Sequence, residues 1–175
     1  DQTLIANTIG AFNNAFGQGA LSLNTTGNYN NAFGRLALRS NTIGNNNNGF
    51  GLYSLYSNVV GANNTAMGHQ ALYSNTTSNN SAFGYKALRF NTTGAYNVAV
   101  GASVLVSNTI GSKNSAFGYG VLQFNTTGVK NSGFGYYALR SNTIGVNNSA
   151  FGSDALRNNT TGIDNNAFGY YALKA

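Results

Sequence analysis

Residues 142–158 read NTIGVNNSAFGSDALRN, and the rest of the 175-residue chain repeats this stretch. Consecutive copies are 17 residues apart, except that the fifth copy has 16 residues. A regular period of this length predicts a stacked-repeat architecture, in which each unit packs on its neighbours. We interpret residues 7–175 as one ten-repeat solenoid and residues 1–6 as the end of a preceding repeat, in a window of a longer array. The copies begin at Asn7, Asn24, Asn41, Asn58, Asn75, Asn91, Asn108, Asn125, Asn142 and Asn159.

Asparagine and glycine mark the turns of each copy, whose positions we number 1 to 17. Positions 1 and 7 are Asn and position 11 is Gly in every copy, and position 4 is Gly except in the shortened copy, where we place Ser78. Glycine supplies positive φ and asparagine tolerates it, so two turns are expected. The pattern predicts two extended segments, at positions 7–10 and from position 14 through position 3 of the next copy. In an all-β parallel β-roll or β-helix, equal positions then stack in register, and the asparagines hydrogen-bond along the stack.

Large apolar residues recur at two positions. Position 10 is Phe in eight copies, with Met67 and Val100 as exceptions, and position 15 is always Leu. We expect both ladders to form the core. Position 9, always Ala or Gly, then faces the other way, toward a neighbouring chain. The predicted core is Phe16, Phe33, Phe50, Phe83, Phe117, Phe134, Phe151, Phe168, Leu21, Leu38, Leu55, Leu72, Leu88, Leu105, Leu122, Leu139, Leu156 and Leu173.

Few residues in this chain carry catalytic chemistry. The sequence has no cysteine, no glutamate, three aspartates and a single histidine, His69, which we expect in an exposed turn. Asp154 and Asp164 fall at different repeat positions, so the pattern predicts no carboxylate pair and no histidine metal site. We therefore expect no enzyme, no metal and no cofactor. Since only 7% of the residues are charged, the surface is typical of an extracellular or virion protein.

Two groups of side chains are candidates for binding. Arg140, Arg157 and Lys174 share position 16 of successive copies and predict a cationic column for an acidic polysaccharide or a cell-surface glycan, unless they splay apart in water. The pairs at 136–137 and 170–171 are both Tyr-Tyr, and they are either sugar-stacking platforms or rings packed along the stack. Nine basic residues spread along a rod do not predict a nucleic-acid groove.

Two further ladders have functional interpretations. Thr recurs at position 2 in nine copies, so an ice-binding threonine ladder is the alternative function. The Asn-x-Ser/Thr sequon occurs nine times. The candidate N-glycosylation sites are those at position 1, namely Asn24, Asn75, Asn91, Asn125 and Asn159.

The unit Asn-Ser-Ala-Phe-Gly-x-x-Ala-Leu at 148–156 resembles the head repeat of trimeric autotransporter adhesins, Asn-Ser-Val-Ala-Ile-Gly-x-x-Ser/Ala. The 17-residue form, with Asn-Thr-Thr-Gly between units, is similar to arrays in tail-fibre and adhesin-like surface proteins. The resemblance covers nearly the whole chain. It implies a left-handed β-roll and a homotrimer of identical chains with the Ala/Gly face inside. No apolar run approaches the roughly 18 residues that span a bilayer, so we expect no membrane insertion of this segment. A three-sided β-helix is the second architecture. We expect a structural segment of an extracellular fibre or filament, such as an adhesin or a phage or virus tail-fibre shaft, with surface or glycan attachment.

Overall fold

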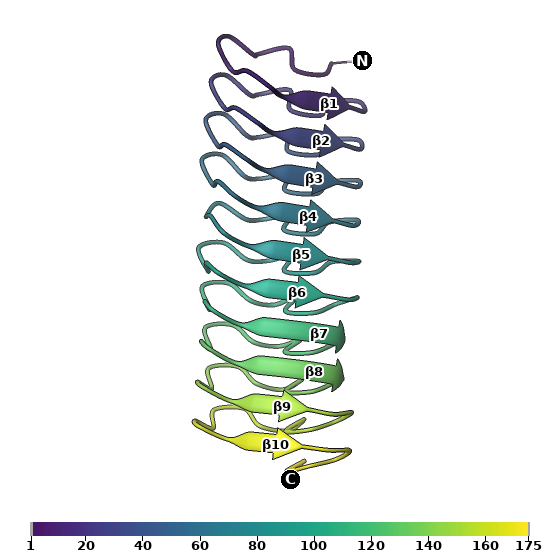
Figure 1. Cartoon of the computed structure of the whole chain (residues 1–175), viewed down its shortest axis with the longest axis vertical. Helices are drawn as coiled ribbons and strands as arrows, with labels where there is room; N and C mark the ends of the chain where they lie inside the picture. Colours follow the sequence, from purple (N-terminus) through teal and green to yellow (C-terminus); the bar gives the residue numbers. More distant parts are fainter. Residues whose placement is uncertain (1, 175) are drawn as a thin grey trace.

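The computed structural model describes residues 2–174 as a single column of stacked coils (Figure 1). The fold is an all-β parallel solenoid, as predicted. One strand from each copy joins a ten-stranded sheet, whose order follows the sequence from β1 to β10. The strands are β1 (Asn14–Phe16), β2 (Asn31–Phe33), β3 (Asn48–Phe50), β4 (Thr65–Met67), β5 (Ser81–Phe83), β6 (Val98–Val100), β7 (Ser115–Tyr119), β8 (Ser132–Tyr136), β9 (Ser149–Phe151) and β10 (Asn166–Phe168).

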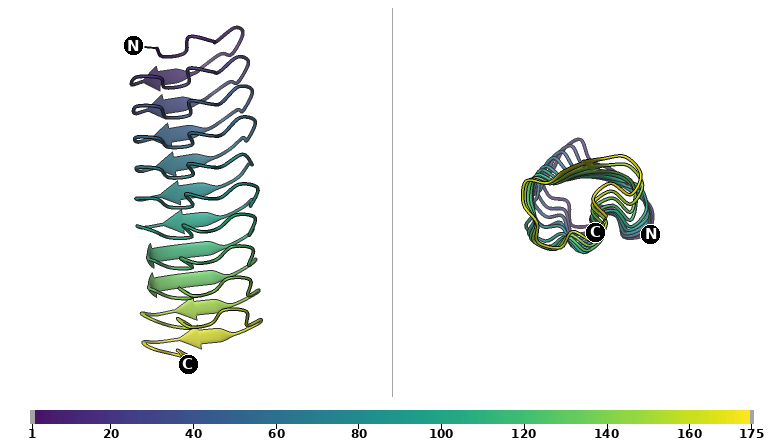
Figure 2. Two further views of the ribbon diagram at one scale, coloured as in Figure 1. Left: turned by 180° about the vertical axis from the view of Figure 1, so that it is seen from behind. Right: turned by 90° about the horizontal axis from the view of Figure 1, so that it is seen from below.

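The repeat period sets the register of this sheet. Each strand covers at least positions 8–10, and equal positions pair, so that Asn14, Ala15 and Phe16 face their counterparts in β2. Viewed along the rod, the coils lie over one another with a small progressive rotation (Figure 2). Residues 2–6 continue the pattern, because the Leu4 amide donates to the Ala20 carbonyl at 3.2 Å. This is the bond that later leucines at position 15 make with position 14 of the next coil.

The second extended segment that we predicted is wrong, because positions 13 to 17 form a turn. The leucine at position 15 has a left-handed backbone in every copy, with φ between 48° and 51°, and position 13 is also left-handed. These two residues bend the chain back, and bonds such as Asn125 N to Leu122 O, 3.1 Å, close the bend. The turn still stacks on the next coil, since Leu122 N donates to Ala138 O at 3.1 Å.

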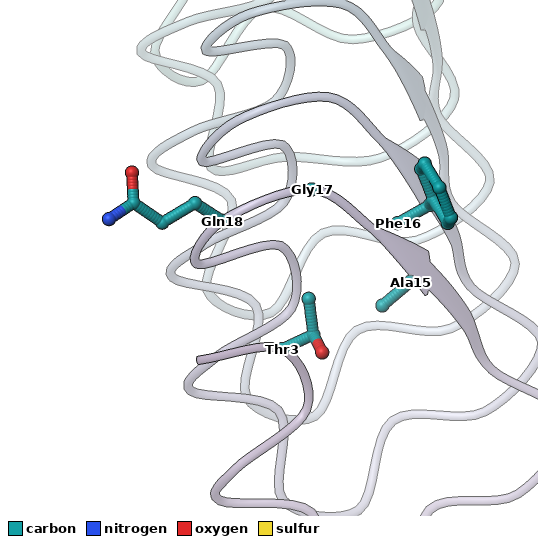
Figure 3. Close-up of a pocket in the computed structure, with 5 residues that line it drawn as sticks. All are labelled: Thr3, Ala15, Phe16, Gly17 and Gln18. Atoms are coloured by element: carbon teal, nitrogen blue, oxygen red, sulfur yellow. The ribbon is translucent and has the colours of Figure 1, made fainter. Parts of the chain in front are cut away.

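The core also differs from the prediction, because the phenylalanines point outward. Ala32 is fully buried, whereas the next residue, Phe33, is 41% exposed. In the first coil, Ala15 points toward Thr3, while Phe16 and Gln18 point away from this space (Figure 3). Alanine at position 9, mostly alanine or valine at position 14, and leucine at position 15 fill the interior. The outward ladder consists of Phe16, Phe33, Phe50, Phe83, Phe117, Phe134, Phe151 and Phe168, with Met67 and Val100 in the same column.

Lack of space inside the coil explains this reversal. A Cβ added to Gly49, at position 9, would lie 3.1 Å from Oγ of Ser54, at position 14, and 3.3 Å from Cγ of Leu38, at position 15. Position 9 is therefore small because the chain's own side chains at positions 14 and 15 fill the space opposite, and our inference that it faces a neighbouring chain is wrong. The predicted leucines from Leu21 to Leu156 are buried, but Leu173, in the last coil, is 58% exposed and lies outside the core.

We expect leucine and phenylalanine substitutions to have unequal effects on stability. Leu122→Ala removes a fully buried side chain and should lower the free energy of unfolding by about 3 kcal/mol. Phe117→Ala, which removes a partly exposed ring, should lower it by about 1 kcal/mol. Urea unfolding followed by circular dichroism measures both values, and a larger loss for Phe117→Ala would contradict the inward position of leucine.

The shortened copy loses a residue from the turn before its strand. The Thr77 carbonyl accepts a bond from Asn75 Nδ2 at 2.7 Å, as the glycine carbonyl at position 4 does elsewhere. Ser78 Oγ accepts from the Ala62 amide at 2.9 Å, the role of the position 5 side chain in other coils. Ser78 therefore corresponds to position 5 and not to position 4, and the missing residue leaves the sheet register intact.

Candidate functional surfaces

Two buried asparagine ladders run through the whole stack, as predicted. At position 1, each Nδ2 donates to Oδ1 of the preceding asparagine, for example Asn125 to Asn108 at 2.7 Å. The same Nδ2 donates to the carbonyl at position 4 of its own coil, 3.0 Å away at Gly128. At position 7, Asn114 Oδ1 accepts from the backbone amide of Asn131 at 2.9 Å. Because both amide hydrogens and the carbonyl oxygen are used, the ladders join neighbouring coils without an unsatisfied polar group.

This bonding contradicts four of the predicted N-glycosylation sites. Asn24, Asn75, Asn91 and Asn125 are fully buried, and their Nδ2 atoms donate two hydrogen bonds each. A glycan on any of these nitrogens would break the ladder and has no space. Asn159, in the last coil, is half-buried, and its Nδ2 donates to Asn142 Oδ1 at 2.9 Å.

The outer face of the sheet carries a phenylalanine stripe, which we define as the position 10 side chains of β1 to β10. Neighbouring rings stack in parallel, with centroids 4.7 Å apart for Phe117 and Phe134 and 5.1 Å apart for Phe33 and Phe50. Positions 8 and 10, which point outward together, carry no charged residue in any copy. The stripe is therefore an uncharged, partly exposed apolar face along the rod, which is typical of an interaction surface.

Positions 12, 13 and 16, in the turn and just before it, form a second surface, which we call the tyrosine–arginine ridge. It holds seven of the nine basic residues and nine of the eleven tyrosines. From the sequence we selected only some of these residues as candidates for binding. The others occupy the same repeat positions, and this shared position is the signal that could have identified them. The basic members are Arg35, Arg39, Lys86, Arg89, Arg140, Arg157 and Lys174, and the tyrosines are Tyr53, Tyr56, Tyr73, Tyr85, Tyr119, Tyr136, Tyr137, Tyr170 and Tyr171.

The predicted cationic column at the end of this ridge does not splay apart in water. The Arg140 guanidinium lies 4.7 Å from the Tyr137 ring centre and 5.0 Å from that of Phe124. Lys174 Nζ lies 3.9 Å from the centre of its neighbouring ring, Tyr171. Arg157 is neutralised by the buried carboxylate of Asp154, with Nη1 2.8 Å from Oδ1. The column is thus ordered by aromatic rings, and two of its three charges have no acidic partner among the described residues.

The two predicted tyrosine pairs differ, because Tyr136 packs along the stack whereas Tyr170 and Tyr171 pack edge to face on each other, with centroids 4.1 Å apart. Tyr119 and Tyr136 stack with centroids 5.5 Å apart, and Tyr56 and Tyr73 stack at 5.1 Å. His69 is part of the same arrangement, half-buried and stacked on Tyr85 at 5.7 Å, and so is less exposed than we predicted. Stacking therefore covers part of the ring faces in the ridge, whereas Tyr170, which is 73% exposed, is open to solvent.

The threonine ladder at position 2 uses its hydroxyl groups internally. Thr109 Oγ1 donates to the Thr126 carbonyl at 3.1 Å, and most other threonines of the ladder repeat this bond. Because these hydroxyl groups already donate to backbone carbonyls, they can act only as acceptors toward ice. The row of threonines is also interrupted by Val59 in the fourth copy.

A hollow of about 250 Å³ at the N-terminal end is lined by Thr3, Ala15, Phe16, Gly17 and Gln18 (Figure 3). These residues occupy position 14 and positions 9–12, so the hollow lies over the edge of β1, where positions 9–12 of an adjacent coil would stack. Residues 2–174 contain no group of three histidine, cysteine, aspartate or glutamate side chains able to hold a metal ion. The described chain also contains no helix that is long and apolar enough to cross a membrane.

The fold and its surfaces define a parallel β-solenoid repeat protein with two distinct outward faces. Comparison with protein-family models, curated proteins and solved structures found no match.

Proposed function

We propose that this chain is a structural rod segment of an extracellular fibre, such as an adhesin or a phage or virus tail-fibre shaft. The observation that carries this proposal is the position 1 asparagine ladder, which is continuous from Asn7 to Asn159. Each coil is bonded to the next by side chains inside and by backbone groups around its circumference. Such a column resists bending and leaves few mobile loops for proteases, which suits a stiff spacer.

The surface chemistry supports the same role. Charged residues make up only 7% of the chain, and uncharged side chains, including exposed tyrosines and the phenylalanine stripe, face outward instead, which suits an extracellular or virion surface. The polar ladders have structural roles that account for most of the chain's asparagines and threonines. We therefore propose a mechanical function, without catalysis.

We further propose that identical chains associate along the phenylalanine stripe. The stripe repeats at the spacing of the coils, so another copy of this chain matches its period along the full length. It carries no charge, so the faces of positively charged chains can meet without repulsion between them. The resemblance to trimeric adhesin heads makes three chains the stoichiometry that we propose.

Replacing three stripe residues should separate these chains. In the variant F117S/F134S/F151S, the apolar contact is lost while the buried leucines remain, so the dissociation constant should rise about 100-fold. The matched control is I43T/I110T/I144T, which removes three other exposed apolar side chains at position 3, where other copies already have threonine. Sedimentation velocity and native mass spectrometry measure the assembly. A monomeric parent chain, or equal effects of the two variants, would refute association through the stripe.

A further inference from the structure

We propose that the tyrosine–arginine ridge binds a linear, carboxylate-bearing polysaccharide that lies along the rod. The inference deepens the fibre function proposed above by naming the partner of its second face. Binding itself requires the solenoid and not the assembly of chains, so the two proposals can fail separately.

The charge distribution is the first support. Within residues 2–174, the ridge carries seven basic side chains and one acidic side chain, Asp154, whereas the phenylalanine stripe carries none. Neighbouring coils are about 4.8 Å apart, which is shorter than the screening length of about 8 Å at physiological salt. Arg140, Arg157 and Lys174 lie on three adjacent coils, so these cations act together on one polymer. Arg89 lies three coils before Arg140, about 14 Å away, so only an extended polymer reaches both. A linear polyanion running parallel to the rod meets several of them in turn, whereas a compact anion meets one or two.

The arrangement of the guanidinium groups is the second support. Arg140 is held between two rings, and its Nε donates to Gln123 Oε1 at 2.9 Å. Arg89 lies over the Phe90 ring, 4.6 Å from its centre. The one salt bridge among the described residues belongs to Arg157, so Arg89 and Arg140 have no carboxylate partner within the chain. Arginine held in place loses little entropy when its planar group binds a carboxylate through two hydrogen bonds.

The aromatic rings favour a polysaccharide over a single-stranded nucleic acid. Bases bind such surfaces by stacking on free aromatic faces. In the ridge, rings such as Tyr56 and Tyr73 or Tyr119 and Tyr136 stack on each other instead, 5.1 Å and 5.5 Å apart, which leaves fewer faces for bases. The exposed edges and phenol groups suit the hydroxyl groups of a sugar polymer. A hydrogen bond with Tyr137 raises the pKa of the Tyr136 phenol, and one with Tyr171 does the same for Tyr170. These phenols stay uncharged at neutral pH and can hydrogen-bond without repelling a carboxylate.

The test measures binding of the 175-residue chain to polygalacturonate by calorimetry at about 50 mM and about 200 mM salt. The variant R89Q/R140Q should raise the dissociation constant at least tenfold, because each arginine loses a charge-assisted contact. The matched control K113Q/K130Q removes the same charge from exposed lysines at position 6, outside the ridge, and should change it less than twofold. R89K/R140K keeps the charge but loses the planar fork, so it should fall between them. All variants should keep the unfolding midpoint of the parent chain.

Two comparison polymers make the test specific. The fully methyl-esterified form of the same polymer lacks carboxylates and should not bind, and single-stranded DNA should bind more weakly than polygalacturonate. Equal loss in the two glutamine variants would show that only net charge matters, and would overturn the proposal. Tighter binding of DNA, or no binding of polygalacturonate at the lower salt, would overturn it too. None of these outcomes alters the association of chains through the phenylalanine stripe.

Discussion

Gly135→Ala should lower the free energy of unfolding by more than about 5 kcal/mol, a very large effect for a single methyl group. Gly135 lies at position 11 with φ 136°, directly after the outward phenylalanine of β8. A Cβ built on it would lie 2.6 Å from the oxygen and 2.7 Å from the carbon of the Gly152 carbonyl. These atoms belong to the backbone of the next coil, so the clash can be relieved only by separating the two coils.

A glycine at the same position of the last coil provides the control. Gly169 has φ 117°, but a Cβ added to it would meet nothing within 4 Å. Gly169→Ala should therefore cost only the backbone strain, about 1 to 3 kcal/mol. Urea unfolding of both variants separates strain from coil contact. Similar losses in the two would show that positive φ alone requires glycine at position 11, and that the approach of the coils does not.

The repeat itself explains how much of this fold can be predicted. Invariant glycine and asparagine at fixed spacing indicate a coil, its length and its in-register stacking, because each backbone turn must lie over the next. The amide ladders follow from the same stacking, since equal asparagines are brought within bonding distance. The expectation of no catalytic chemistry rests on the composition alone, with no cysteine, no glutamate and a single histidine.

The direction of the strand side chains was harder to predict. Alternation along a strand says that Ala150 and Phe151 face opposite sides, but not which side is the interior. Hydrophobicity favoured the larger ring, and that inference failed because the narrow coil has space for one large ladder only. The variation at each repeat position was a better guide to which side is the interior. Position 9 is always Ala or Gly and position 15 always Leu, whereas Met67 and Val100 replace phenylalanine at position 10.

The left-handed turn could not have been found from residue types. Position 13 includes Tyr53, Lys86 and Asp154, all with φ between 57° and 59°, and nothing in their chemistry requires this conformation. Stacking on neighbouring coils imposes it, at some local cost. Because positions 12, 13 and 16 lie in this turn or just before it, the tyrosine–arginine ridge was only partly recognised. In this solenoid, the repeat position of a residue decides which surface of the rod it belongs to, and its neighbours in the sequence do not.

Asn47→Ala should lower the free energy of unfolding by about 4 kcal/mol, although it removes a polar side chain from a protein with many asparagines. Asn47 is fully buried at position 7, and its Oδ1 accepts from the backbone amide of Asn64 at 3.1 Å and from Asn64 Nδ2 at 3.2 Å. Its Nδ2 donates to the Gly61 carbonyl at 2.7 Å. Alanine would leave two buried donors of Asn64 without an acceptor, each costing about 1 to 3 kcal/mol, and would also leave a small cavity.

The adjacent residue provides a matched control for this substitution. Asn48 begins β3 and points to the outer face, where its Oδ1 accepts one bond from Asn31 Nδ2 at 2.8 Å. Asn48→Ala makes the same chemical change one residue away, and should cost about 1 kcal/mol or less, because water can replace the lost partner. Urea unfolding of the two variants compares an inner ladder with an outer one. If Asn48→Ala proved as costly as Asn47→Ala, burial would not be the source of the effect, and the stiffness that we attribute to the inner ladders would lose its physical basis.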